Sequence, residues 1–187
     1  PEYVVAEWRT VSKSFAEAGL EVVFTGHYHA NDITKGDFEG GASLFDIETG
    51  SLVTSPCPYR IIDFNRTNKS FKIETLHVNS IASHPTDFPA YAKNFLQDGM
   101  TGIVGYQLSQ PPYNLTDPML SYVTGLVVPA FMAHYAGDES ADSVTEATYW
   151  SMMKSPDPVI ASLGLSLYSL WTDLTPEDNN TTITVDH

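Results

Sequence analysis

Two histidines separated by a single residue have the clearest chemical potential in this sequence. The motif Gly26-His27-Tyr28-His29 directly follows the apolar run Val22-Val23-Phe24. Neutral imidazole suits borderline metals such as zinc, iron, manganese and nickel. If the chain bends after the run, both rings face one cleft, and Gly26 lets the backbone leave the run without steric penalty. The motif is therefore interpreted either as a metal-binding pair or as two solvated imidazoles on a surface turn.

The residues before the motif predict a helix followed by a strand. Apolar side chains spaced four, three and four residues apart predict one face of an α-helix over residues 4–18. These side chains are Val4, Trp8, Val11 and Phe15. Gly19 is expected to cap the helix, because glycine accepts the left-handed conformation there. Residues 20–24 then predict a strand that is central in its sheet and delivers the histidines at its carboxyl end, where open α/β sheets place their chemistry.

The segment from Ala42 to Val78 predicts a three- or four-stranded antiparallel meander. Thr49-Gly50 and the segment Asn65-Arg66-Thr67-Asn68 are the expected turns. The expected strands are Ser43–Glu48, Ser51–Thr54, Arg60–Phe64 and Phe71–Val78.

Residues 80–187 predict a mainly helical region. Ala90–Gln97 is expected to form a short helix that Gly99 ends, Ser143 to Glu146 fits a capping box, and Asp157-Pro158 opens another helix. Ile183 and Val185 suit a final edge strand. The predicted fold is therefore α+β, with residues 1–79 and 80–187 as its two parts.

Charge and hydropathy exclude several classes of partner. Nine basic and twenty-three acidic residues give a net charge of −14, so nucleic acid would be repelled. The apolar stretch Leu120–Tyr135 is expected to be a buried helix pair or a kinked helix, because it is too short to cross a hydrocarbon core of about 30 Å. Cys57 is the single cysteine, so no intrachain disulfide can form. The sequence assigns no compartment.

The segment Val23–His29 closely resembles the last conserved block of the calcineurin-like metallophosphoesterases, a strand followed by Gly-His-x-His. The meander resembles the end of the same domain, so the resemblance covers residues 1 to about 78. It implies a partial αββα sandwich of helix, strand and antiparallel meander, followed by a helical C-terminal subdomain. It also implies two divalent metal ions (manganese, zinc, iron or nickel), with His27 on one and His29 on the other.

The resemblance implies a phosphohydrolase that acts on a small phosphomonoester or phosphodiester. Tyr28 is then a candidate substrate-binding residue, either leaning over the phosphate or covering the cleft floor. The earlier ligand blocks of the family, Asp-x-His, Gly-Asp-x-x-Asp and Gly-Asn-His-Asp/Glu, are absent from these residues. No catalytic residue is identified in this chain. Because two imidazoles cannot hold two ions, the chain is expected to be an inactive C-terminal part of the enzyme.

The competing interpretation is a non-catalytic interaction or oligomerisation module with a degenerate phosphoesterase half. Residues 80–187 are then an interaction region rather than a cap that narrows substrate choice. Exposed sheet surface and an uncovered edge favour a homo-oligomer in either case.

Other polar residues near these features are given structural interpretations. Asn31-Asp32 are expected to be solvated turn residues, with contacts to a ligand imidazole as the alternative. His134 is expected to be a core histidine with one hydrogen bond. Asp138-Glu139 and Glu177-Asp178 are expected to lie in solvated loops.

Overall fold

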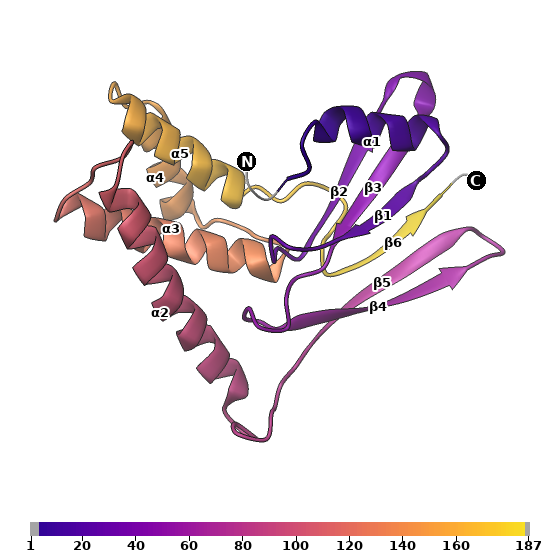
Figure 1. Cartoon of the computed structure of the whole chain (residues 1–187), viewed down its shortest axis with the longest axis horizontal. Coiled ribbons are helices and arrows are strands. Elements are labelled where there is room, and N and C mark those ends of the chain that lie inside the picture. Colours follow the sequence, from indigo (N-terminus) through magenta and orange to yellow (C-terminus); the bar gives the residue numbers. More distant parts are fainter. Residues whose placement is uncertain (1–3, 186–187) are drawn as a thin grey trace. The chain divides into compact units, whose positions relative to one another are not determined.

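The computed structural model describes residues 4–185 and has an α+β fold of helices and two small, mostly antiparallel sheets (Figure 1). The chain divides into two compact units. Unit 1 comprises the residues up to Val78 and those from Leu174 onward, and unit 2 comprises Asn79–Asp173. Residues 174–187, which the sequence analysis grouped with the helical part, thus belong to unit 1.

Unit 1 contains one helix and both sheets. Its elements are α1 (Trp8–Glu17), β1 (Val22–Thr25), β2 (Asp32–Asp37), a 3-10 turn (Glu39–Gly41), β3 (Ser43–Glu48), β4 (Pro58–Asn65), β5 (Ser70–His77) and β6 (Asn180–Thr184). Sheet A has the strand order β1-β3-β2, in which β1 is parallel and β2 antiparallel to β3. Sheet B has the order β4-β5-β6 and is antiparallel throughout.

The core of unit 1 lies between the two sheets. One buried isoleucine from each of four strands forms it: Ile33 of β2, Ile47 of β3, Ile73 of β5 and Ile183 of β6. Burying such a side chain is worth about 1.5–3 kcal/mol relative to leaving it exposed. Helix α1 contacts β3 (Figure 1), so unit 1 has the layers helix, sheet A and sheet B.

Helix α1 ends as the sequence predicts but begins later. Gly19 has a φ of 87°, its N–H donates to the Ala16 carbonyl, and the Leu20 N–H donates to the Phe15 carbonyl. This pair of bonds is a Schellman motif, which confirms the glycine cap. The predicted start at residue 4 is wrong, since Glu7 is left-handed with a φ of 56° and the helix begins at Trp8.

The predicted meander is correct in its second half and wrong in its first. β4 and β5 pair across the predicted turn, and β6 adds the predicted edge strand. Ser51–Thr54, however, forms turns, and β3 pairs instead with β2, which the sequence analysis missed. β1 lies at the edge of sheet A in the described residues rather than at its centre.

Gly50 explains why the predicted hairpin at Thr49-Gly50 fails. A Cβ at Gly50 would lie 2.7 Å from Pro58 Cγ and 3.1 Å from the His29 carbonyl oxygen. Position 50 therefore requires glycine because the His29 backbone approaches it closely, and not because a hairpin turn is formed there.

Unit 2 is helical. Its helices are α2 (Phe88–Ser109), α3 (Met119–Ala136), α4 (Ser143–Met153) and α5 (Pro158–Leu170). Helix α2 continues through Gly99, so the predicted short helix ending there is wrong. Asp157 caps α5 and Pro158 occupies its first turn, as predicted. The cap of α4 is Asp142, whose carboxylate accepts the Thr145 N–H at 2.7 Å, rather than Ser143.

Helix α3 is the central apolar helix of unit 2. It contributes Val123, Val127 and Val128 to the buried core of that unit. Among the described residues α3 alone is long and apolar enough to cross a membrane, judged by length and composition only. One such helix is weak evidence because core helices of soluble proteins pass the same test, so no clear span is indicated.

Candidate metal-binding loop

Residues 26–31, called the histidine loop below, connect β1 to β2 and carry both candidate ligands. His27 has a φ of 93° and His29 a φ of 72°, a left-handed region that residues other than glycine rarely adopt. Such a conformation costs on the order of 1–3 kcal/mol per residue and persists only where the surroundings enforce it. Both histidines are therefore held in place by their neighbours.

Gly26 does not have the role that the sequence suggested. Its φ is not positive, and the nearest atom to an added Cβ would be the Thr49 carbonyl oxygen at 3.9 Å. The histidines themselves, and not the glycine before them, adopt the unusual backbone that turns the chain.

The loop lies at the carboxyl ends of two parallel strands. β1 ends at Thr25 and β3 ends at Glu48, and these two residues are partners in the register. The segments that follow both strands therefore start side by side, which is where open α/β sheets bind ligands. The Tyr28 N–H donates to Glu48 Oε1 at 3.0 Å, so the end of β3 holds the middle of the loop.

The His29 ring is oriented by a buried hydroxyl. Its Nδ1 lies 2.8 Å from the Oγ1 atom of Thr54, a residue that is 5% exposed in the segment after β3. In the tautomer in which Nδ1–H donates to this oxygen, Nε2 keeps its lone pair. Metal-binding histidines are commonly oriented in this way, with the second nitrogen bonded to an oxygen of the protein. His29 is half-buried, whereas His27 is exposed.

Asn31 fixes the end of the loop from inside unit 1. Its Nδ2 donates to Asn179 Oδ1 at 2.8 Å and to Thr75 Oγ1 at 3.3 Å, and its Oδ1 accepts the Gly50 N–H at 3.4 Å. Asn31 is completely buried, so the expectation of a solvated turn residue is wrong for it. Asp32 is the first residue of β2 and is half-buried. Sequence alone could not find this network, since Asn31 and Asn179 are 148 residues apart.

Asp178 is the second buried polar residue that supports this region. Its Oδ1 accepts the Ile33 N–H at 2.7 Å, and its carbonyl accepts a hydrogen bond from Arg60 at 2.9 Å. The side chain is 1% exposed, so the prediction that Glu177-Asp178 is a solvated loop is wrong for Asp178. The C-terminal tail thus braces β2 directly after the histidine loop.

The loop by itself offers two imidazoles. Among the residues that the structure describes, no third imidazole, thiol or carboxylate joins His27 and His29 in a group that could enclose an ion. Tyr28, between them, is half-buried. Burial raises the pKa of the nearby Cys57 thiol above its ordinary value of 9.0, so this thiol stays protonated at neutral pH.

In unit 2, the remaining candidate histidine is paired with a carboxylate. His134 Nδ1 lies 2.7 Å from Glu139 Oε1, so the predicted hydrogen-bond partner is present, but the residue is half-buried and does not belong to the buried core of unit 2. Glu139 is 8% exposed, so the prediction of a solvated loop at Asp138-Glu139 is wrong for Glu139.

No protein-family model matches this sequence, and no curated protein does.

Proposed function

We propose that the histidine loop is the metal-ligand segment of a two-metal phosphohydrolase, and that His27 and His29 each bind one of two divalent ions. The observation that carries the proposal is the constraint on both histidines. Each has left-handed backbone, and the His29 ring is bonded to a buried threonine that leaves Nε2 available. Left-handed residues also occur in surface turns, as at Lys69 between β4 and β5, but a solvated turn does not require that a buried hydroxyl orient the ring.

The layer order of unit 1 supports the same proposal. Helix α1, sheet A and sheet B follow one another in the order expected for three of the four layers of an αββα sandwich. We propose that unit 1 is the C-terminal portion of such a sandwich and that unit 2 is a cap or interaction region.

The chemistry follows from the residues of the loop. Bound divalent ions (manganese, zinc, iron or nickel) supply a hydroxide nucleophile near neutral pH and neutralise phosphate oxygens. Thr54 orients the His29 ring through Nδ1, so Nε2 would be the atom that holds an ion, and exposed His27 would hold the second. The net charge of −14 repels a phosphomonoester or phosphodiester, so the ions must reverse the local field. Carboxylate ligands from outside these residues complete the site, and the isolated chain turns over little or no substrate.

Metal titration of the purified chain tests the proposal. Weak binding of Ni²⁺, an ion that imidazole suits without carboxylates, is followed by paramagnetic relaxation of the histidine NMR signals and should be lost in His27→Ala and in His29→Ala. Thr54→Val should weaken binding about 10- to 100-fold, because it removes the oxygen that orients His29. Thr54→Ser keeps the hydroxyl and should bind like the wild type.

His84→Ala, in unit 2, is the matched histidine control and should leave the titration unchanged. Equal binding by His29→Ala and His84→Ala would overturn the assignment. Hydrolysis of bis-p-nitrophenyl phosphate by the isolated chain with Mn²⁺ or Zn²⁺ would contradict the claim that further ligands are needed.

A non-catalytic oligomerisation module is the second candidate, and one observation favours it. Helix α1 exposes Trp8 and Phe15 to 43% and 45%, although both belong to its apolar face. The second copy of this chain would cover that face. Concentration-dependent dimerisation in sedimentation, lost in Phe15→Ser, together with Ni²⁺ titrations that His27→Ala and His29→Ala leave unchanged, would favour this candidate over the enzyme.

A further inference from the structure

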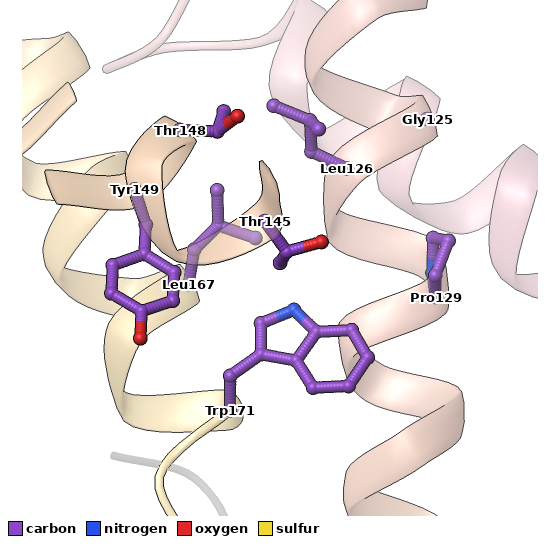
Figure 2. Close-up of a pocket in the computed structure, with 8 residues that line it drawn as sticks. All are labelled: Gly125, Leu126, Pro129, Thr145, Thr148, Tyr149, Leu167 and Trp171. Carbon is purple, nitrogen blue, oxygen red and sulfur yellow. The ribbon is translucent and has the colours of Figure 1, made fainter. Parts of the chain in front are cut away.

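Unit 2 contains a small pocket of its own between α3, α4 and α5 (Figure 2). Its volume is about 90 Å³. The lining residues are Gly125, Leu126, Pro129, Thr145, Thr148, Tyr149, Leu167 and Trp171. Since one water occupies about 30 Å³ of the liquid, the pocket accommodates about three waters or one molecule of roughly three to five heavy atoms.

A buried hydrogen-bond donor borders this pocket without an acceptor. Trp171 Nε1 is inaccessible to solvent and has no hydrogen-bond partner within the described part of the chain. Figure 2 shows its indole along one side of the pocket, with the nitrogen turned inward on the side of Thr145. An indole nitrogen only donates, and a buried donor that lacks an acceptor destabilises the fold. An oxygen atom bound in the pocket would remove that cost.

Helix α3, which also lines the pocket, has a backbone carbonyl that lacks its helical donor. Pro129 lies inside α3 and has no N–H, so the Gly125 carbonyl, four residues earlier, lacks its usual helical donor. Both residues line the pocket. A ligand that donates and accepts at one atom, as a hydroxyl group does, suits the carbonyl and the indole together.

Gly125 is an exposed position in the lining of the pocket. A Cβ added there would meet no atom within 4 Å, so a larger side chain can be introduced at this position without a clash.

The lining also defines the charge of the ligand. No charged side chain borders the pocket, and Leu126, Tyr149 and Leu167 make its walls largely apolar. The Thr148 hydroxyl already donates to the Val144 carbonyl at 2.8 Å. Small-molecule sites typically combine apolar walls with a few placed polar groups in this way.

We propose that this pocket binds a small neutral hydroxyl compound, with the ligand oxygen accepting from Trp171 Nε1 and its hydroxyl donating to the Gly125 carbonyl. The site lies wholly within unit 2. It does not depend on the metal-binding role of the histidine loop.

Titration of the ¹⁵N-labelled chain with 1-propanol tests the site. The chain has three tryptophans, so the indole N–H region is simple, and Trp171→Phe identifies the Trp171 signal. The expected result is a saturable downfield shift of the Trp171 signal alone. The dissociation constant should be about millimolar, as a ligand of so few atoms allows.

Gly125→Leu should fill the pocket and weaken binding at least about tenfold. Gly102→Leu is the matched control, because it lies within α2, also meets no atom within 4 Å and does not line the pocket. It should bind 1-propanol like the wild type. If Gly125→Leu does not fold, Gly125→Ala decides, since it reduces the volume while favouring the helix.

Two results would overturn the proposal. One is a linear shift shared by all three indoles, which means that the pocket holds only water. The other is a saturable Trp171 shift that persists in Gly125→Leu and Gly125→Ala, which places the alcohol elsewhere.

Discussion

At the scale of single residues, the histidine loop depends on its backbone as much as on its side chains. His27 and His29 are both left-handed, and Gly50 lies against the His29 carbonyl. The sequence motif predicted which residue types could bind a metal, but it assigned the unusual conformation to Gly26. That error arises because glycine is the usual left-handed residue, whereas here Gly50 and Thr54 contact His29, and Glu48 accepts the Tyr28 N–H, so these residues hold the loop instead.

Substitution of Gly50 tests this account of the loop. Gly50→Ala brings a methyl group within 3.1 Å of the His29 carbonyl and 2.7 Å of Pro58, so it should lower the free energy of unfolding by about 1–3 kcal/mol. Gly26→Ala, which meets nothing closer than 3.9 Å, should change it by less than about 0.5 kcal/mol. Urea denaturation measures both. A larger loss in Gly26→Ala than in Gly50→Ala would show that the loop is built differently.

At the scale of helices and strands, the sequence predicted the features that depend on residues close together in the chain. The Gly19 cap, the start of α5 and the β4–β5 turn were predictable because each depends on neighbouring residues. β2 was missed because Lys35-Gly36-Asp37 is polar and contains a glycine, which resembles a turn. Its strand conformation is enforced instead by pairing with β3 and by burial of Ile33 in the core.

The N-terminal cap of α4 gives a pH-dependent prediction. Hydrogen bonds from Thr145 hold the pKa of Asp142 below its ordinary value of 3.8. Because the folded pKa is lowered, the stabilisation by Asp142 is complete above that ordinary value and is lost as the pH falls through the folded pKa. Asp142→Ala should therefore lower the melting temperature of unit 2 by a few degrees at pH 7, and this difference from the wild type should shrink in acid.

Asp142→Asn is the control for this prediction, because asparagine caps helices without titrating there. Differential scanning calorimetry at pH 7 and in acid should show that the advantage of asparagine over alanine persists at low pH. If that advantage also disappears in acid, the pH dependence does not come from the Asp142 carboxylate.

At the scale of the whole molecule, the chain leaves unit 1 after β5 and returns to it as β6. Unit 2 is thus inserted between two strands that are antiparallel neighbours, with Glu74 opposite Asn180. The sequence predicted that residues 183 and 185 form an edge strand but grouped them with the helical region instead of unit 1. Hydrophobic alternation defines the faces of a strand and carries no information about its partner.

Substitution of Asp178 tests how much the C-terminal tail contributes to the free energy of unfolding. Asp178→Ala removes the acceptor of the Ile33 N–H and should lower the free energy of unfolding by about 2–3 kcal/mol, since the donor stays buried. Asp178→Asn keeps one oxygen and should recover most of that loss. Glu177→Ala, at an exposed neighbour, should have almost no effect in urea denaturation. Equal midpoints for the two alanine variants would mean that the tail does not brace β2.

The insertion of unit 2 between β5 and β6 has a consequence for biosynthesis. A ribosome completes β1 to β5 first and then needs about 5–20 s to make a segment the size of unit 2 before β6 emerges. During that interval the isoleucine core lacks Ile183, and Asn31 lacks its bond to Asn179. The nascent unit 1 also presents β5 with one unpaired edge, the kind of edge that pairs with another chain. The time needed to synthesise unit 2 is thus the interval during which a newly made chain is most prone to misassembly.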